Sequence, residues 1–203
     1  MKTRLLIATA NRGKLRELEA LLGDGFALEG LAAHPSVRLP PEGSDYAPNA
    51  AAKARSAALA SGLPALADDS GLEVDALGGA PGPLSARYGG DALDDAGRVQ
   101  RLLGELAARG AQTSRAARFV CFVALALPSG ALHVAHGECA GEILRAPRGA
   151  NGFGYDPIFS PDRGARSMAE LADAEKNRIS HRARALSALA PALAALREPQ
   201  SRG

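Results

Sequence analysis

The spacing of apolar residues predicts strands and helices that follow one another along the first half of the chain. Residues 3–9 have the continuous apolar pattern of a buried strand, and four leucines between residues 15 and 22 then recur at helical spacing. An alanine-rich helix is predicted at residues 49–61, bounded by turn-forming residues. Residues 66–68 are predicted to form a short strand that leads into a second strand near residues 72–74. The end of the first strand therefore leads directly into the start of a helix.

The second half of the chain predicts a hairpin and further helices. Residues 94–109 alternate apolar and charged positions at helical spacing. Two long strands at 117–127 and 131–143 flank Pro128-Ser129-Gly130, which indicates an antiparallel hairpin. The remaining segments are a glycine-rich loop around a short strand at 147–161, a short helix at 168–175 and a last helix at 181–196. We expect an α/β fold with two lobes, a long mixed β-sheet flanked by helices, and a substrate cleft between the lobes.

Length and composition are those of an ordinary globular protein. The chain has 203 residues, of which 46% are hydrophobic and 23% charged, so it can bury a core. We expect one two-lobed domain at residues 1–197 and a disordered tail at 198–203. A net charge of only +2 argues against a nucleic-acid partner, and no apolar run approaches the ~18 residues of a membrane span. Cys121 and Cys139 lack a paired spacing, which predicts buried, reduced thiols in the cytoplasm.

Lysine is rare, and its positions mark the candidate chemistry. Only four of the 24 basic residues are lysines, and three of them are Lys14, Lys53 and Lys176. This sequence uses arginine for most of its positive charges. A lysine in such a sequence suggests a site that needs a compact ammonium group and not a planar guanidinium group. Lys53 lies on the alanine-rich helix, and the simpler alternative is that its side chain extends into solvent.

The segment that contains Lys14 lies between a strand end and a helix start. It consists of Thr9, Ala10, Asn11, Arg12, Gly13 and Lys14. Free backbone N–H groups and the helix dipole favour an anion at such a position, so the segment is a candidate phosphate cradle. Its spacing differs from that of the Walker loop. The alternative is a plain strand-to-helix turn in which Asn11 caps the helix.

The run Asp68-Asp69-Ser70-Gly71 carries the candidate metal and base chemistry. Adjacent residues of an extended chain point to opposite faces, so only one of the two aspartates can face a given cleft. A carboxylate at a strand end suits a hard-cation site or a general base for water. Glu42, in a proline-rich loop, is the nearest candidate for a second ligand, because Mg²⁺ commonly uses one or two protein carboxylates. The alternative is an Asx-type turn that caps the strand.

Two later segments suit a flat ring. In the loop at 149–157, glycines allow close approach of the backbone, Phe153 offers a stacking face and Asp156 an acceptor. His181 and Arg182 begin the last helix, where arginine beside histidine can donate to a carbonyl oxygen of a purine. The alternatives are a tight loop whose aromatic rings pack inward, and a helix cap at the surface.

Taken together and in this order, these motifs resemble those of the inosine/xanthosine triphosphate pyrophosphatase family. The resemblance covers nearly the whole chain and is carried by residues 9–14, 49–54, 67–72, 77–82, 85–88, 152–157 and 180–182. It implies a homodimeric hydrolase of α/β subunits. The implied reaction is Mg²⁺-dependent hydrolysis of ITP, dITP and XTP to the monophosphate and pyrophosphate, which removes these nucleotides from the pool.

The resemblance also implies roles for individual residues. Asp69 is implied to be both the base for the attacking water and a metal ligand. The residues implied to hold phosphates are Thr9, Asn11, Lys14, Lys53 and Ser70, with Lys176 reaching across the cleft. The residues implied to line the base pocket are Phe153, Gly154, Tyr155, Asp156, His181 and Arg182.

The chain departs from the family pattern upstream of Asn49. The family commonly has an acidic residue about eight positions before the Asn-Ala pair and another directly before it, whereas this chain has Pro41 and Pro48. We therefore assign the second metal-ligand role to Glu42. Two alternatives stay open: a pyrophosphatase for other modified nucleotides, and a catalytically inactive nucleotide-binding protein.

Overall fold

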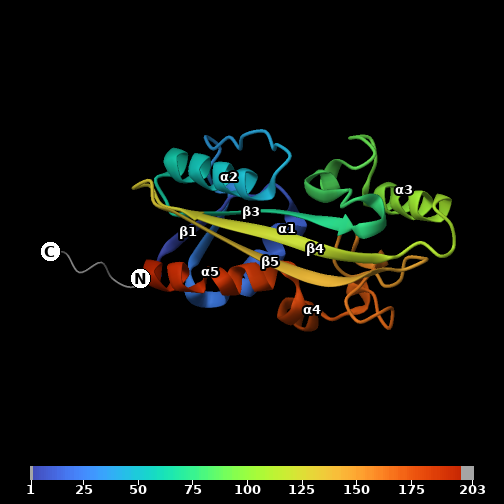
Figure 1. Cartoon of the computed structure of the whole chain (residues 1–203). Helices are drawn as coiled ribbons and strands as arrows, with labels where there is room; N and C mark the ends of the chain where they lie inside the picture. Colours follow the sequence, from blue (N-terminus) through green and yellow to red (C-terminus); the bar gives the residue numbers. More distant parts are fainter. Residues whose placement is uncertain (1, 198–203) are drawn as a thin grey trace. The chain divides into compact units, whose positions relative to one another are not determined.

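The structure is a computed structural model that describes residues 2–197, so the predicted tail at 198–203 lies outside it. Its strands form a six-stranded sheet in the order β2-β1-β3-β4-β5-β6. Figure 1 labels β1, β3, β4 and β5 of this sheet. The strands are β1 (Arg4–Ile7), β2 (Ala27–Gly30), β3 (Ala65–Val74), β4 (Ala116–Ala126), β5 (Leu132–Ile143) and β6 (Phe159–Ser160). The α-helices are α1 (Arg12–Leu22), α2 (Tyr46–Ser61), α3 (Asp95–Ala108), α4 (Asp173–Ile179) and α5 (His181–Arg197).

The sheet is mixed, which confirms the predicted fold class. Strand β1 pairs in parallel with β2 and β3, whereas β5 pairs antiparallel with β6. The predicted hairpin is present as β4 and β5, and Leu127 donates to the carbonyl oxygen of Ala131 at its turn. Among residues 2–197, none of the helices has the length and apolar character needed to cross a membrane.

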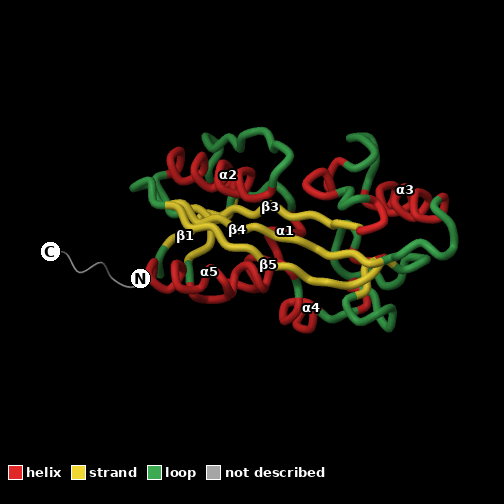
Figure 2. Tube along the Cα trace, in the orientation of Figure 1, coloured by secondary structure: helices red, strands yellow, loops and turns green. Residues whose placement is uncertain are grey.

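The chain divides into two compact units. Unit 1 comprises residues 2–69, 121–137 and 182–197 of the described chain, and unit 2 comprises residues 70–120 and 138–181. The divisions fall within β3, β4 and β5, so each of these strands contributes to both units. Figure 2 shows these three as long strands.

Unit 1 has helices on both faces of its strands, and the strand residues alternate between the two faces. Leu5, Ile7 and Leu66 pack in a core with apolar residues of α1 and α5. Leu6 and Ala67 pack in a separate core with the alanines of α2. Figure 1 shows α2 and α5 on opposite sides of the strands. Because side chains alternate along a strand, the two residues after Ala67 in β3 must also point to different helices.

Unit 2 has its own core, in which α3 packs on the strands. Val99, Leu102 and Leu106 recur at helical spacing and are buried with Phe119 and Phe159. Helix α3 begins where predicted, because the Asp94 carboxylate accepts a hydrogen bond from the backbone N–H of Gly97 at 2.8 Å.

Three local predictions need correction. The two strands predicted around residues 66–74 are one continuous strand, β3, so Asp68 and Asp69 lie in its interior and not at a strand end. Strand β2 was not predicted, because its four residues are only half-buried and carry no clear alternation. The helix predicted at 168–175 is a 3₁₀ turn at Met168–Glu170 followed by α4, which begins where the Glu175 carboxylate accepts a hydrogen bond from Ala172.

Candidate functional site

Asp68 continues the face of β3 that packs on α1 and α5. Its side chain is fully buried, and its Oδ2 lies 3.2 Å from Lys14 Nζ. The same oxygen accepts from Nε and Nη2 of Arg182 at 3.2 and 3.0 Å. Arg182 is 1% exposed and also pairs with Glu17 of α1. Asp68 therefore ties β3 to the first turns of both helices through a buried ion cluster.

Asp69 faces the other way and contacts α2. Asn49 Nδ2 donates to Asp69 Oδ2 at 2.8 Å, and Lys53 Nζ lies 3.5 Å from Asp69 Oδ1. Lys53 also bonds Glu42 Oε1 at 2.6 Å, although only 6% of this lysine is exposed. Lys53 does not extend into solvent, and its ammonium group contacts the two carboxylates that the sequence singled out as metal ligands.

Burial and neighbouring charges shift the pKa values of Asp68, Asp69 and Lys53. Burial raises the pKa of Asp69 above its usual 3.8, and the opposing effects of Lys53 and Asn49 do not cancel it. Burial would raise the pKa of Asp68 too, but Lys14 and Arg182 outweigh it and lower that pKa. Burial alone would lower the pKa of Lys53, yet Asp68, Asp69 and Glu42 together raise it. Two adjacent carboxyl groups thus have pKa values shifted in opposite directions, which is common where two acids have different roles.

The segment before α1 was predicted to be either a phosphate cradle or a plain turn in which Asn11 caps the helix. Asn11 caps α1, since its Oδ1 accepts from the backbone N–H groups of Gly13 and Lys14 at 2.8 and 3.0 Å. Thr9 Oγ1 in turn accepts from the N–H of Asn11 at 3.2 Å. Three of the N–H groups expected to cradle a phosphate, those of Asn11, Gly13 and Lys14, are therefore already bonded. The ammonium group of Lys14 is the part of the segment that lies beside an aspartate of β3.

The donor set around Lys53 fits a magnesium ion that is shared with a substrate. No cluster of three or more His, Cys, Asp or Glu side chains able to hold a metal occurs among residues 2–197. Glu42 and Asp69 offer two carboxylates that already share one cation, and Mg²⁺ is often held by one or two carboxylates plus phosphates. Pro48 does not disturb this arrangement, because it lies in the first turn of α2, where no intrahelical bond is lost.

The glycine-rich loop of unit 2 is held by a second buried ion pair. Lys176 Nζ lies 2.5 Å from Asp156 Oδ2, and both side chains are almost fully buried. The same oxygen accepts from the backbone N–H of Phe153 at 2.8 Å, and the ammonium group lies 5.2 Å from the centre of the Phe153 ring. Gly152 has a φ of +75°, and a side chain there would meet the Asp156 carboxylate. Asp156 and Lys176 therefore shape the loop that presents Phe153.

The other predicted ring-binding residues have different surroundings. Tyr155 is buried and donates to the carbonyl oxygen of Ser85 at 3.0 Å, so its hydroxyl supports the fold of unit 2. The ring of His181 stacks on Phe119 with 4.7 Å between centres. Arg182 belongs to unit 1, and its guanidinium group is bonded to Asp68 and Glu17. The guanidinium group of Arg182 thus lies in a buried ion cluster, and its role as a reader of the purine stays a prediction.

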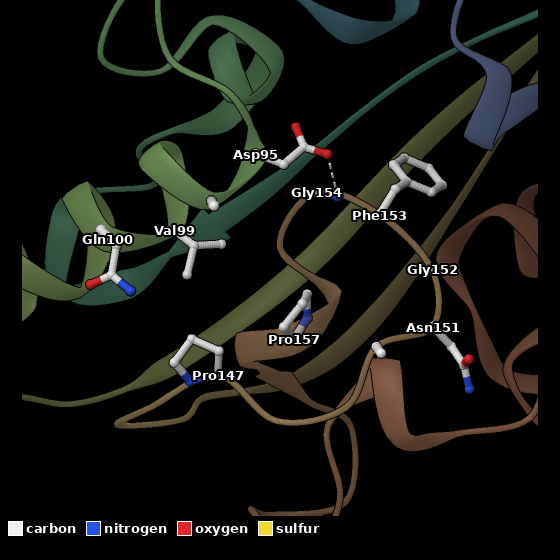
Figure 3. Close-up of a pocket in the computed structure, with 11 residues that line it drawn as sticks. Asp95, Val99, Gln100, Pro147, Asn151, Gly152, Phe153, Gly154 and Pro157 are labelled. Carbon is white, nitrogen blue, oxygen red and sulfur yellow. Dashed lines mark hydrogen bonds between the residues drawn. The ribbon is translucent and has the colours of Figure 1, made fainter.

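A pocket of about 230 Å³ lies between α3 and the same loop (Figure 3). Val99 and Asp95 of α3 both line it, and one carboxylate oxygen of Asp95 accepts from the N–H of Gly154 at 2.8 Å. The residues that line it are Asp95, Ala96, Val99, Gln100, Pro147, Ala150, Asn151, Gly152, Phe153, Gly154 and Pro157. These lining residues include no lysine or arginine, so the pocket is unsuited to a triphosphate.

The contact between Asn49 and Asp69 was not predicted from the sequence. The amide lies four residues before Lys53, so both side chains fall on one face of α2. That spacing was a signal that could have linked Asn49 to the same carboxylates. The role of Asp95 in holding Gly154 had no signal in the sequence, because the two residues are 59 positions apart.

Comparisons with known proteins agree over almost the whole length. The profile of the Ham1 family matches residues 5–192. A dITP/XTP pyrophosphatase of Deinococcus deserti is 54% identical over 187 residues, covering 91% of this chain and 86% of that protein. The protein of the same name from Deinococcus radiodurans is 50% identical over 188 residues, covering 92% and 90%. The structure of a HAM1 protein from Coxiella burnetii has a TM-score of 0.84 at 43% identity, covering 95% of this chain and 99% of that one.

Proposed function

Because this chain belongs to the Ham1 family, we propose that it hydrolyses non-canonical purine nucleoside triphosphates, namely dITP, ITP and XTP, to the monophosphate and pyrophosphate. Support comes from relatives named dITP/XTP pyrophosphatase that are about half identical over nine-tenths of the chain. The observation that carries the proposal is the setting of Asp69. Its buried carboxylate is contacted by Asn49 and Lys53, and Lys53 also bonds Glu42.

Asp69 acts in this proposal as the general base. It takes a proton from water as the water oxygen bonds to the α-phosphorus, while the bond from that phosphorus to the α,β-bridging oxygen breaks and pyrophosphate leaves. A carboxylate whose pKa is raised by burial is a stronger proton acceptor than a solvated one. Lys53 and Lys14 lie close enough to Asp69 for their charges to influence it, and they stabilise negative charge on the departing pyrophosphate.

Glu42 and Asp69 would hold Mg²⁺ in this proposal. The ion supplies positive charge that offsets the charge of the triphosphate. Lys53 orients both carboxylates before substrate binds, since it contacts each of them. Ser70 and residues 9–13 complete the proposed phosphate contacts.

Recognition of the base is assigned to the glycine-rich loop. The purine ring stacks on Phe153, whose backbone is fixed by Asp156 and Lys176. Gly154, Tyr155 and His181 complete the proposed base side. Arg182 follows His181 in the chain and is assigned to the base side with it, although its guanidinium group is bonded to Asp68 and Glu17.

The test is release of pyrophosphate from ITP, XTP, dUTP and GTP at one concentration, with Mg²⁺ and with a chelator. We expect pyrophosphate from ITP and XTP in the presence of Mg²⁺, much less from GTP and dUTP, and none with the chelator. Preferred cleavage of dUTP would make the protein a pyrophosphatase for other nucleotides. Binding of ITP without release of pyrophosphate at any Mg²⁺ concentration would make it a nucleotide-binding protein without activity.

Two further properties are proposed from the family resemblance. We expect the protein to be a homodimer, which sedimentation equilibrium measures directly. We also expect it to work in the cytoplasm, and its two buried free thiols, Cys121 and Cys139, fit a reducing compartment.

A further inference from the structure

The amide of Asn49 is bonded at both ends, and its side chain is almost completely buried. Its Oδ1 accepts from the backbone N–H of Gly43 at 2.7 Å. Its Nδ2 donates to the carbonyl oxygen of Gly43 at 3.1 Å and to Asp69 Oδ2 at 2.8 Å. A flipped amide would place its NH₂ against the N–H of Gly43 and its oxygen against the carboxylate, so these partners permit a single orientation.

Asn49 and Lys53 together hold the same two elements from one face of α2. Asn49 bonds the backbone at Gly43, and Lys53 bonds the side chain of the preceding residue, Glu42. Both also contact Asp69, with Asn49 on Oδ2 and Lys53 on Oδ1. The loop that carries Glu42 and the strand that carries Asp69 are thereby joined through two side chains one helical turn apart.

We infer that Asn49 is a positioning residue for the divalent cation: it sets the spacing between Glu42 and Asp69 before the metal binds. This inference rests on the proposed metal-dependent hydrolysis. Asn49 suits the role because it is neutral and offers both a donor for a carboxylate and an acceptor for the loop. An aspartate would repel Asp69, and a serine hydroxyl is too short to bond both partners.

Loss of Asn49 leaves both candidate ligands in the protein but no longer holds them together. Residues that orient metal ligands typically change metal affinity or activity by about 10–100-fold when they are replaced. We therefore expect Asn49→Ala to weaken metal binding by about 10-fold or more. The KM for ITP at saturating metal should stay within about twofold of wild type, since Asn49 is not proposed to contact the nucleotide.

The experiment measures Mn²⁺ binding to the full chain without nucleotide, by the enhancement of water-proton relaxation. The Mg²⁺ concentration that gives half-maximal hydrolysis of ITP is a second readout. Leu59→Ala, on the exposed side of the same helix, is the matched control and should change neither value. If Asn49→Ala fails to fold in a urea titration, Asn49→Ser provides the same test with a smaller loss of packing.

Weaker Mn²⁺ binding and a raised Mg²⁺ requirement in a folded Asn49 variant support the inference. Wild-type Mn²⁺ affinity in that variant overturns it, and so does a raised KM for ITP with unchanged metal affinity. A wild-type protein that hydrolyses ITP without any divalent cation refutes the metal site itself. A wild-type protein that binds Mn²⁺ but does not hydrolyse ITP contradicts the proposed reaction and leaves the role of Asn49 measurable.

Discussion

Replacing the charged Asp68 by a neutral residue should lower the Tm of the protein, whereas the same replacement at Asp69 should not. Asp68→Asn keeps the shape of the side chain but removes the charge that faces Lys14 and Arg182. Arg182 is 1% exposed, so its guanidinium group cannot turn to water for compensation. Asp69→Asn is the matched control, because it is the same substitution one position along the same strand.

The size of the effect follows from the contacts. Removing one partner of a buried ion pair typically costs about 3–5 kcal/mol. Glu17 remains beside Arg182 and the new amide can still accept a hydrogen bond, so we expect the lower end, about 3 kcal/mol. For a domain of this size that corresponds to a fall in Tm of about 6–12 °C. For Asp69 the folded environment raises the pKa, which means that it disfavours the charge. Asp69→Asn should therefore leave Tm unchanged or slightly raised.

The assay pairs thermal unfolding with turnover for the two variants. Asp69→Asn should lose roughly 10²- to 10⁴-fold in kcat as the proposed base is removed, with its Tm intact. Asp68→Asn should lose stability and, at a temperature well below its Tm, retain much more activity than Asp69→Asn. An Asp68→Asn variant that melts at the wild-type temperature, or an Asp69→Asn variant that is the less stable of the two, would contradict a stabilising role for the buried Asp68 ion cluster.

Three further predictions test the lysine, the aromatic ring and the acid response. Lys53→Met should lower kcat/KM by about 10²–10³-fold. Lys53→Arg should fall between it and wild type, because the guanidinium group keeps the charge but is larger than the ammonium group that is buried beside Glu42 and Asp69. An unaltered Lys53→Arg enzyme would count against a site that needs a compact ammonium group. Phe153→Ala should raise the KM for ITP by about 5- to 150-fold with little change in Tm, as expected for loss of base stacking, and an unchanged KM would remove Phe153 from the base side. The folded protein lowers the pKa of Asp68 below its usual 3.8. The Asp68 carboxylate therefore contributes its full stabilisation above about pH 3.8, and this stabilisation is lost as the pH falls toward the lower pKa of the folded state. Urea unfolding should thus show a constant difference between wild type and Asp68→Asn from about pH 5 to 8 that shrinks in stronger acid, whereas a difference that grows in acid would reverse the assigned sign.

The alternation of side chains along a strand correctly predicted that Asp68 and Asp69 face opposite ways. The rule that neighbours on a strand face opposite ways separated Asp68 from Asp69 before any contact was known. The same rule could not say which aspartate meets which helix, because that depends on where α1, α2 and α5 pack against the sheet. The end of α2 followed from Gly62, which has the left-handed conformation that glycine favours. The start of α2 did not, because the helix begins at Tyr46, three residues before the predicted start, and has no side-chain cap.

Long-range pairs lay beyond the reach of the sequence. Arg182 and Asp68 are 114 positions apart, and no periodicity indicates that they form a buried ion pair. Arginine beside histidine at a helix start was interpreted as a ligand-binding group or as a cap at the surface, and neither interpretation indicated the buried ion pair with Asp68. The approach of Glu42 to Lys53 depends on the path of an irregular loop, which has no repeating pattern from which it could be derived.

The central claim is that water attacks the α-phosphorus with Asp69 as the base. Hydrolysis of ITP in water enriched in ¹⁸O, followed by mass spectrometry of both products, tests it most directly. We predict that the label appears in the monophosphate, that pyrophosphate carries none, and that Asp69→Asn slows this incorporation together with turnover. Label in pyrophosphate, or release of single phosphates in place of pyrophosphate, would contradict the mechanism.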